Sequence, residues 1–192
     1  MGTNSNGFSL LELIVIIGIL GITIAFAVPN LTTMIANNRI TAGASDFVAA
    51  LQFAKGEAVS RVNPVTICNR NAAGTGCVAA SDWSQGWIVF SDANDNGALD
   101  NGEEVLLNHE PLNQGITFRG TAAVANSITY RPSGSIVSRP PGANNSVVIA
   151  STQALVICDG RGFGNFARGI LVTITGRGSV MNASDTGQRT CL

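Results

Sequence analysis

The feature that most constrains the fold of this chain is a long apolar stretch close to its N-terminus. From Phe8 to Val28 the sequence is FSLLELIVIIGILGITIAFAV, with Glu12 as its only charged residue. As an α-helix this stretch would span ~31 Å, which matches the ~30 Å hydrocarbon core of a bilayer. Its many Ile, Val and Leu residues also suit a strand, but a run of this length favours a membrane-spanning helix.

A cleaved secretory signal peptide is the alternative, and it requires a basic N-terminal region, a shorter apolar core and a cleavage site after that core. Here the apolar run is longer, and helical sequence continues through Pro29. Asn63-Pro64 ends the helix because a residue before proline is disfavoured in the α region. We therefore expect a transmembrane and assembly helix over residues 8–28 that continues as an amphipathic helix over residues 29–62. The apolar residues of the amphipathic half recur at three- and four-residue steps: Ile40, Ala44, Phe47, Leu51, Ala54 and Ala58.

Residues 63–192 predict a β-rich head. Short segments rich in Val, Ile and Thr alternate there with Gly, Asn or Pro clusters, which is typical of strands and turns. The predicted strands are Val65–Asn69, Gly86–Phe90, Glu104–His109, Ile116–Arg119, Ser127–Arg131, Ser146–Ala150, Leu155–Asp159, Gly169–Thr175 and Ser179–Asn182. Gly160–Gly164 and Pro140–Asn145 predict loops, and no second helix of ordinary length is expected. The fold class is α+β, one long N-terminal helix packed on a β-rich head.

The segment around the start of the apolar run resembles a known processing site. Gly7-Phe8-Ser9-Leu10-Leu11-Glu12 is similar to the G-F-[ST]-L-[IL]-E site of type IV prepilins. The resemblance implies that residues 1–7 are a leader, that prepilin peptidase cleaves after Gly7, and that the new N-terminal Phe8 is methylated. It also implies that Glu12 pairs with the terminal amine of a neighbouring subunit during assembly. An ionisable group in a membrane segment costs about 2–3 kcal/mol, so Glu12 is a functional hypothesis, with snorkelling to the interface as the alternative.

Most of the chain is similar to the GspH/FimT group of minor pilins and pseudopilins, which includes FimU/FimT-like proteins. The resemblance rests on the long helix, the strand Trp87–Phe90 with the acidic turn that follows it, and the many later strands. It implies a pilin fold, with the helix in the inner membrane and the head in the periplasm before assembly into the filament. It further implies a structural subunit of a type IV pilus that helps prime assembly or cap the tip. Its partners would be other minor pilins, the major pilin and prepilin peptidase.

Two alternative functions remain open at this stage. A DNA-binding minor pilin for natural transformation has the same processing site and the same outline. A minor pseudopilin of type II secretion shares them as well. The sequence alone does not separate these possibilities from a pilus-assembly subunit.

The chain has four cysteines, and three disulfide pairings are possible. A head on the periplasmic side lies where disulfides form, so we expect Cys68, Cys77, Cys158 and Cys191 to be oxidised. Pairing Cys68 with Cys77 and Cys158 with Cys191 closes the shortest loops, but the sequence does not choose among the pairings. Disulfides are favoured over a zinc site because there is no Cys-x-x-Cys pair and a single histidine.

No catalytic constellation emerges, and the protein is not expected to be an enzyme. A Ser/His/Asp or Cys/His site would have to use His109, which lies among strand residues and is expected to be solvated. The glycine-rich segment Gly160–Gly164 lacks the Lys-Ser/Thr of a phosphate-binding loop. Trp83 and Trp87 are expected in the core of the head rather than on a ligand-binding surface.

Residues 92–103 match the D-x-[DN]-x-[DN]-G-x₅-E pattern of calcium loops. The oxygen ligands would come from Asp92, Asn94, Asn96, Asp100 and Glu103. However, both flanks predict strands instead of the two helices of an EF-hand, and a hairpin loop rich in Asn, Asp and Gly needs no metal to turn. We therefore expect no cofactor. Calcium binding by this loop is the one metal-binding hypothesis to be tested.

The formal net charge is −1, which excludes a generally basic nucleic-acid coat, but the charge is unevenly placed. Residues 82–110, here called the acidic belt, hold seven acidic residues and no Lys or Arg, whereas seven arginines follow from position 119 onward. FimT-like pilins that bind DNA carry a Gly-Arg-x-Arg motif, and here Gly176-Arg177-Gly178-Ser179 lacks the second arginine. The candidate DNA contacts are Arg161, Arg168, Arg177 and Arg189.

Two to four phosphate contacts, each adding about 0.9 to the salt slope, would give only weak, salt-sensitive DNA binding. We therefore favour a different role for the basic half of the head. In this interpretation Arg177 supports a turn, and the basic half meets the acidic belt of an adjacent subunit.

Overall fold

The computed structural model describes residues 9–79, 82–113, 115–140 and 145–191. The chain divides into two compact units, residues 1–38 and residues 39–192. A single helix, α1 (Leu10–Arg61), contributes to both units. The second unit adds antiparallel β-sheets to its part of the helix, so the predicted α+β class is confirmed.

The first unit consists, in its described part, of the N-terminal portion of α1. Every residue from Ser9 to Ile35 is exposed. Pro29 lies inside the helix, and the hydroxyl groups of Thr32 and Thr33 both donate to its carbonyl oxygen. By length and composition, α1 is the one helix among the described residues that is able to cross a membrane.

The second unit holds the rest of α1, whose buried face follows the predicted stripe. Ile40, Ala44, Phe47, Leu51, Ala54 and Ala58 are all buried, together with Gly43 and Ala50. The helix ends at Arg61, before the Asn63-Pro64 pair that predicted its end. All buried residues of the described structure lie at position 40 or later, so residues 39–192 contain the complete core.

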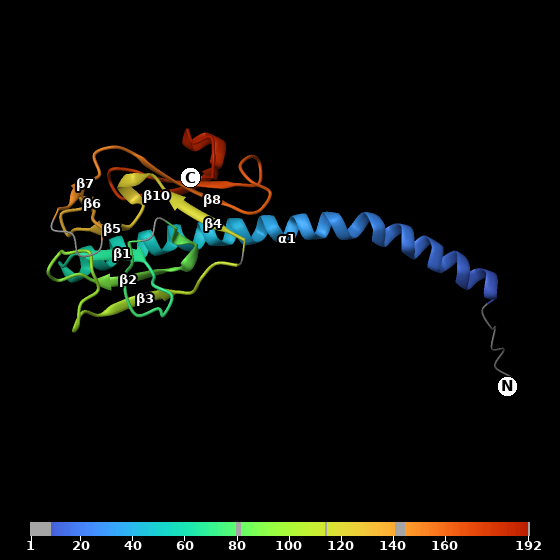
Figure 1. Ribbon diagram of the computed structural model, residues 1–192, viewed down its shortest axis with the longest axis horizontal. Helices are drawn as coiled ribbons and strands as arrows, with labels where there is room; N and C mark the ends of the chain where they lie inside the picture. Colours follow the sequence, from blue (N-terminus) through green and yellow to red (C-terminus); the bar gives the residue numbers. More distant parts are fainter. Residues whose placement is uncertain (1–8, 80–81, 114, 141–144, 192) are drawn as a thin grey trace. The chain divides into compact units, whose positions relative to one another are not determined.

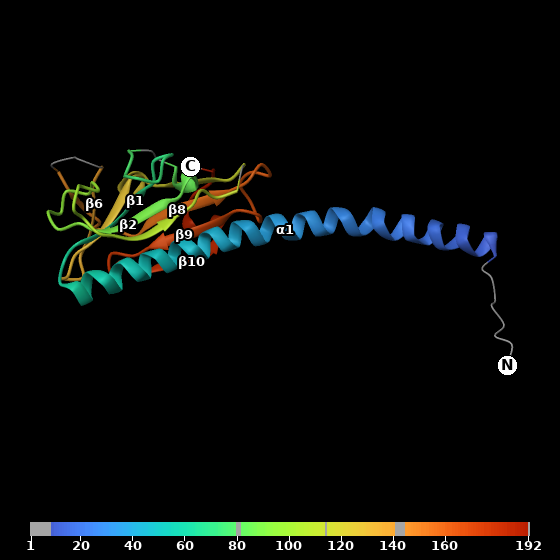
Figure 2. The ribbon, with the colours of Figure 1, turned by 90° about the horizontal axis from the view of Figure 1, so that it is seen from below.

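Ten strands of the described residues form two antiparallel sheets (Figure 1). The six-stranded sheet has the order β3-β2-β1-β5-β6-β7, and the four-stranded sheet has the order β10-β9-β8-β4. Their bounds are β1 Val65–Asn69, β2 Trp87–Ser91, β3 Val105–His109, β4 Thr117–Gly120, β5 Ser127–Tyr130, β6 Ile136–Ser138, β7 Val147–Val148, β8 Gln153–Cys158, β9 Arg168–Val172 and β10 Gly178–Asn182. Strands β8, β9 and β10 lie over the second half of α1 (Figure 2).

The nine predicted strands all exist, with ends that differ by a few residues. The sequence missed β6, because three residues between a turn and Pro140 are too short to show an alternating pattern. There are also three short 3₁₀ helices: η1 (Trp83–Gln85) before β2, η2 (Ala122–Val124) before β5, and η3 (Ala183–Thr186) after β10. Gly160–Gly164 lies in a loop as expected, whereas the predicted loop Pro140–Asn145 falls largely outside the described residues.

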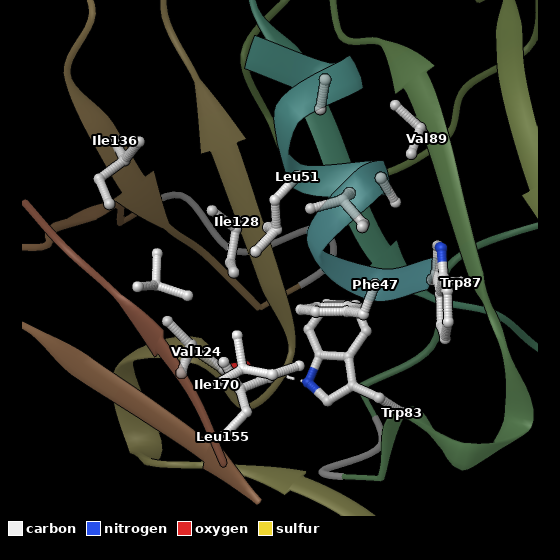
Figure 3. Packing of buried hydrophobic residues seen from close by; sticks show 14 of the residues in the cluster. Phe47, Leu51, Trp83, Trp87, Val89, Val124, Ile128, Ile136, Leu155 and Ile170 are labelled. Carbon is white, nitrogen blue, oxygen red and sulfur yellow. Dashed lines mark hydrogen bonds between the residues drawn. The ribbon is translucent and has the colours of Figure 1, made fainter. Parts of the chain in front are cut away.

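The core of the head is centred on an aromatic cluster between α1 and the sheets (Figure 3). The Phe47 ring meets Trp83, Trp87 and Phe118 edge-on, with ring centroids 4.9–5.1 Å apart. All four side chains are fully buried, which confirms both tryptophans as core residues. The Trp83 Nε1–H donates to the Val124 carbonyl oxygen at 3.1 Å, so this buried donor is satisfied.

We expect Phe47→Ala to lower the free energy of unfolding of the head by about 3–5 kcal/mol, because it removes the ring that three other aromatic rings contact. The measurement is urea unfolding of residues 39–192, followed by tryptophan fluorescence. Phe53→Ala, which truncates a phenylalanine of the same helix that is 38% exposed, is the matched control and should cost much less. Equal losses for the two variants would contradict this account of the core.

Candidate functional site

The processing residues Gly7 and Phe8 lie outside the described residues. The predicted assembly residue Glu12 lies in the first turn of α1, where its side chain is exposed. A carboxylate in the first turn of a helix interacts favourably with the positive end of the helix dipole. Glu12 is therefore available to a cation from outside the chain, which is what an assembly role requires.

The four cysteines form two disulfides, Cys68–Cys77 and Cys158–Cys191. Of the three possible pairings, the protein adopts the one that closes the shortest loops. The first bond ties β1 to the loop that follows it, with Arg70 and Cys77 also joined by an isolated β-bridge. The second bond ties the C-terminal segment to the end of β8, beside a small buried cluster that includes Val156 and Ala167.

The acidic loop, residues 92–103, is organised around one fully buried carboxylate. Asp92 follows β2, and its Oδ1 accepts the backbone N–H of Asn96 at 2.9 Å. Its Oδ2 accepts the N–H of Gly97 at 2.9 Å and the hydroxyl group of Thr66, on β1, at 2.6 Å. The loop turns because Gly97 has a φ of +73°. Asp92 thus shapes the loop and fastens it to the central strand of the sheet.

The outer carboxylates of the acidic loop also bind groups of the loop itself. Asp100 Oδ2 accepts from the side-chain amides of Asn94 and Asn96 at 2.9 and 2.7 Å, which lowers the pKa of Asp100. Glu103 accepts the backbone N–H groups of Ala93 and Asp100 at 3.0 Å each. Its pKa is nevertheless raised, chiefly because partial burial disfavours its charged form.

These contacts give the calcium hypothesis no support. The five candidate ligands do fall in one loop, but their oxygens satisfy amide and hydroxyl donors of the protein. In the described part of the chain, no group of three or more His, Cys, Asp or Glu side chains is placed to hold a metal ion. Calorimetric titration of the protein with Ca²⁺ is the direct test.

Four of the seven acidic residues of the acidic belt, residues 82–110, form ion pairs with arginines of the same chain. Asp82 pairs with Arg119 at 3.6 Å, and Asp95 pairs with Arg131 at 2.5 Å. Two further acidic residues, Glu104 and Glu110, pair with Arg61 and Arg70 at 2.6 and 3.1 Å. The sequence suggested that this belt meets the basic half of an adjacent subunit, but much of it already meets arginines of its own head.

The four candidate DNA contacts have different surroundings. Arg161 pairs with Asp159 at 2.7 Å and lies over the ring of Phe166, and this pairing lowers the pKa of Asp159. Arg168 Nη1 donates to the backbone carbonyls of Asn165 and Ala167.

Arg177 is exposed in the turn between β9 and β10, and Arg189 is exposed after η3. The backbone of Arg177 closes this turn, because its N–H bonds the Thr173 hydroxyl group and its carbonyl accepts the Thr173 N–H. The turn-supporting role expected for Arg177 is therefore present at its backbone, while its side chain is exposed.

His109 is not the solvated side chain that the sequence suggested. Its ring stacks on Trp87 with centroids 3.8 Å apart, and its Nε2 lies 3.7 Å from Asp46 on α1. The reason is that β3 places His109 directly opposite Trp87 of β2. Sequence reasoning missed this pair because it depends on strand register, which the short strands do not reveal.

These features can be compared with known proteins. Residues 43–178 match the family described as Type II transport protein GspH. The chain belongs to the GspH family. No curated protein sequence matches this chain.

Two crystal structures of the type IV minor pilin FimU from Pseudomonas aeruginosa share the fold of this GspH-family chain. Both are 20% identical to it, with TM-scores of 0.55 and 0.53. The first match covers 81% of this chain and 96% of the FimU chain, and the second covers 79% and 99%. The minor pseudopilin EpsH of the Vibrio cholerae type 2 secretion system matches with 11% identity and a TM-score of 0.46, over 75% of this chain and 97% of the EpsH chain.

We expect Asp92→Ala to destabilise the head by about 2–3 kcal/mol, because it leaves buried N–H and O–H donors without an acceptor. Urea unfolding of residues 39–192 measures the loss. Asp100→Ala, which removes an exposed carboxylate of the same loop, should change the unfolding midpoint much less. If Asp100→Ala proved as costly as Asp92→Ala, Asp92 would not be the residue that organises the loop.

Proposed function

We propose that this GspH-family protein is a minor pilin, a structural subunit of a type IV pilus, and not an enzyme. The observation that carries the proposal is the continuity of α1. One helix supplies an exposed apolar segment long enough to span a membrane and then forms part of the head core. A helix of this kind suits a subunit that waits in the membrane and then packs beside other helices in a filament.

The apolar segment of α1 has two successive environments in this proposal. In the inner membrane its exposed Ile, Val and Leu side chains face lipid, and the head lies in the periplasm. In the filament the same side chains pack against helices of other minor pilins and of the major pilin. Two disulfides in the head fit the oxidising periplasm.

The leader and Glu12 supply the steps between these environments. Prepilin peptidase removes residues 1–7 and methylates Phe8, which leaves a cationic amine at the start of the apolar segment. Glu12 pairs with the amine of a neighbouring subunit in the low-dielectric helix bundle, where an unpaired charge is costly. Such pairing favours correct axial register between subunits over random lateral contact.

Within the pilus, priming of assembly or capping of the tip is the role we favour over DNA capture. Of the four candidate arginines, Arg161 has a carboxylate partner and Arg168 donates to backbone carbonyls. A gel-shift assay of the head at low salt, comparing wild type with Arg177→Ala, tests DNA binding directly. Type II secretion remains the other alternative, and deletion of the gene with separate assays of pili and of secretion distinguishes the two systems.

One prediction of the pilin proposal concerns processing. We expect Gly7→Ala to accumulate as an uncut precursor in the membrane, because the peptidase requires glycine at the cleaved bond. Mass spectrometry of the wild-type protein should find N-methylated Phe8 as the N-terminal residue. An intact Met1 on protein recovered from filaments would contradict the pilin proposal.

Another prediction of the pilin proposal concerns Glu12. We expect Glu12→Val to insert into the membrane at least as well as wild type, since it removes a charge from an apolar helix. Its recruitment into sheared filaments, measured by immunoblot against the membrane fraction, should fall strongly. Glu12→Gln keeps the shape and polarity without the charge and should also fail. Normal recruitment of both variants would mean that Glu12 only snorkels to the interface.

A further inference from the structure

Strands β8, β9 and β10 run along α1, and their two ends meet different parts of the helix (Figure 2). At one end, a Cβ at Gly43 would lie 3.1 Å from the side chain of Ile157, near the end of β8. At the other end, Lys55 donates to the carbonyl oxygen of Thr175, in the turn between β9 and β10. The helix reaches Gly43 before Lys55, so the end that holds Ile157 is the one at which α1 enters the head.

Two segments meet at this end, and together they are here called the base of the head. Residues 159–168 contain the loop between β8 and β9, and residues 183–191 contain η3 and the C-terminal segment. The backbone N–H of Ala183 donates to the carbonyl oxygen of Ala167 at 3.4 Å. A disulfide also ties the C-terminal segment to the end of β8. The two segments therefore form one connected part of the surface.

An exposed aromatic ring lies in the base beside two arginines. Phe166 is 39% exposed, and the guanidinium of Arg161 lies over its ring, 4.3 Å from the centroid. Arg168 Nη1 donates to the backbone carbonyl oxygens of Asn165 and Ala167, the residues on either side of Phe166. These hydrogen bonds hold a second guanidinium close to the ring. The base thus presents an apolar side chain with cations next to it.

The base carries more positive than negative charge. Arg168 and Arg189 have no acidic partner among the described residues, and neither does Arg39, which is exposed on α1 where the helix enters the head. Its acids are Asp159, which is paired with the arginine over the exposed ring, and Asp185, which is exposed in η3. Four arginines against two aspartates leave a net charge of +2.

The base is separate from the other charged features of the head. Arg177, the fourth candidate DNA contact, lies in the turn at the opposite end of β9 and β10, so the four candidate arginines do not form one continuous surface. Asp46, an exposed acid of α1, lies 3.7 Å from His109 of β3 and so faces the other sheet.

The path of the chain limits how far the base lies from the membrane. The apolar stretch ends at Val28, and Arg39 follows eleven positions later in the same helix. Eleven residues of α-helix span ~16 Å, of which the lipid headgroup layer takes up about 5–7 Å. The remainder is close to the Debye length of about 8 Å at physiological ionic strength. This upper limit holds at any angle of the helix.

We propose that the base of the head binds the anionic phospholipid surface of the membrane that holds α1. Phe166 enters the headgroup layer, and Arg39, Arg168 and Arg189 face lipid phosphates. Aromatic and basic side chains are those with which peripheral segments bind anionic bilayers. The inference rests on the proposed pilin function, which places α1 in the inner membrane and the head in the periplasm.

The contact is weak for a free head and effective for an anchored one. One partly exposed ring and a small net charge do not hold a soluble protein on a bilayer. The membrane-spanning helix, however, keeps the base at a high effective concentration near the headgroups. The head of an unassembled subunit therefore rests on the membrane, and its entry into a filament requires release from the lipid.

The experiment uses the full-length chain in nanodiscs of phosphatidylcholine, either alone or mixed with about one-third phosphatidylglycerol. Asn165→Cys, exposed beside Phe166, carries a fluorophore whose emission rises in an apolar environment, while the native cysteines stay in their disulfides. We expect several-fold stronger emission in the anionic nanodiscs, falling as the salt concentration is raised. Ile174→Cys, exposed in the turn at the opposite end, should give the same emission in both.

Further substitutions in the Asn165→Cys protein test which residues make the contact. Replacing both Arg168 and Arg189 by Gln should lower the emission in anionic nanodiscs to its level in neutral ones. Arg189→Gln alone, which changes an exposed side chain and leaves the fold intact, should lower it in part. Phe166→Ser should also lower it. Arg177→Gln is the matched control, because it removes an equally exposed and unpaired charge from the opposite end, and it should have no effect.

Equal emission from position 165 in the two kinds of nanodisc would overturn this inference, as would a loss for Arg177→Gln as large as that for the double variant. Binding of a short DNA duplex through Arg168 and Arg189, without a lipid signal, would overturn it too and assign the base to nucleic acid. These results leave the pilin proposal standing. That proposal fails separately if the chain is not processed at Gly7 or not recruited to filaments.

Discussion

The structure of the head depends on the close approach of α1 to two sheets around one phenylalanine. Phe47 contacts three other buried rings, two of which come from the neighbouring elements η1 and β2 and the third from the later strand β4. The helix comes near enough because many of its buried positions are glycine or alanine: Gly43, Ala44, Ala50, Ala54 and Ala58. A Cβ at Gly43 would lie only 3.1 Å from Ile157 and 3.2 Å from Leu112. Small residues therefore set the distance, and the aromatic cluster fills the space that remains.

Much of this arrangement could be predicted from the sequence because two of its patterns are strong. The uninterrupted apolar run and the three- and four-residue steps from Ile40 to Ala58 specify the helix and its buried face. The alternation of Val, Ile and Thr with glycine-rich turns specifies most strands. The sequence did not predict features that are short or that depend on strand register. The three residues of β6 are too few to show an alternating pattern, and the stacking of His109 on Trp87 follows from the pairing of β2 with β3.

The candidate sites, like the fold, could be predicted from the sequence only in part. The cysteines and the residues of the acidic loop were found from spacing, whereas the partners of each carboxylate required coordinates. A pattern such as D-x-[DN]-x-[DN]-G specifies which oxygens are near one another, but it does not say whether a cation or the amides of the loop will occupy them. In this chain Asp92 binds Thr66 and two backbone N–H groups, and Asp95 binds Arg131. Arginines distant in sequence balance the acidic belt, and no local motif reveals such pairs.

The connection from α1 to β1 has a mechanical consequence. Only Val62, Asn63 and Pro64 separate the end of the helix from β1, and β1 is paired on both sides, with β2 and β5. A pull along the helix therefore loads an interior strand in shear, so that the hydrogen bonds of both ladders resist together instead of opening one at a time. Cys68, the fourth residue of β1, is bonded to Cys77, so the covalent link limits how far the strand can slide. A head attached to its anchor in this way should extend little before it breaks, as suits a part of a fibre under tension.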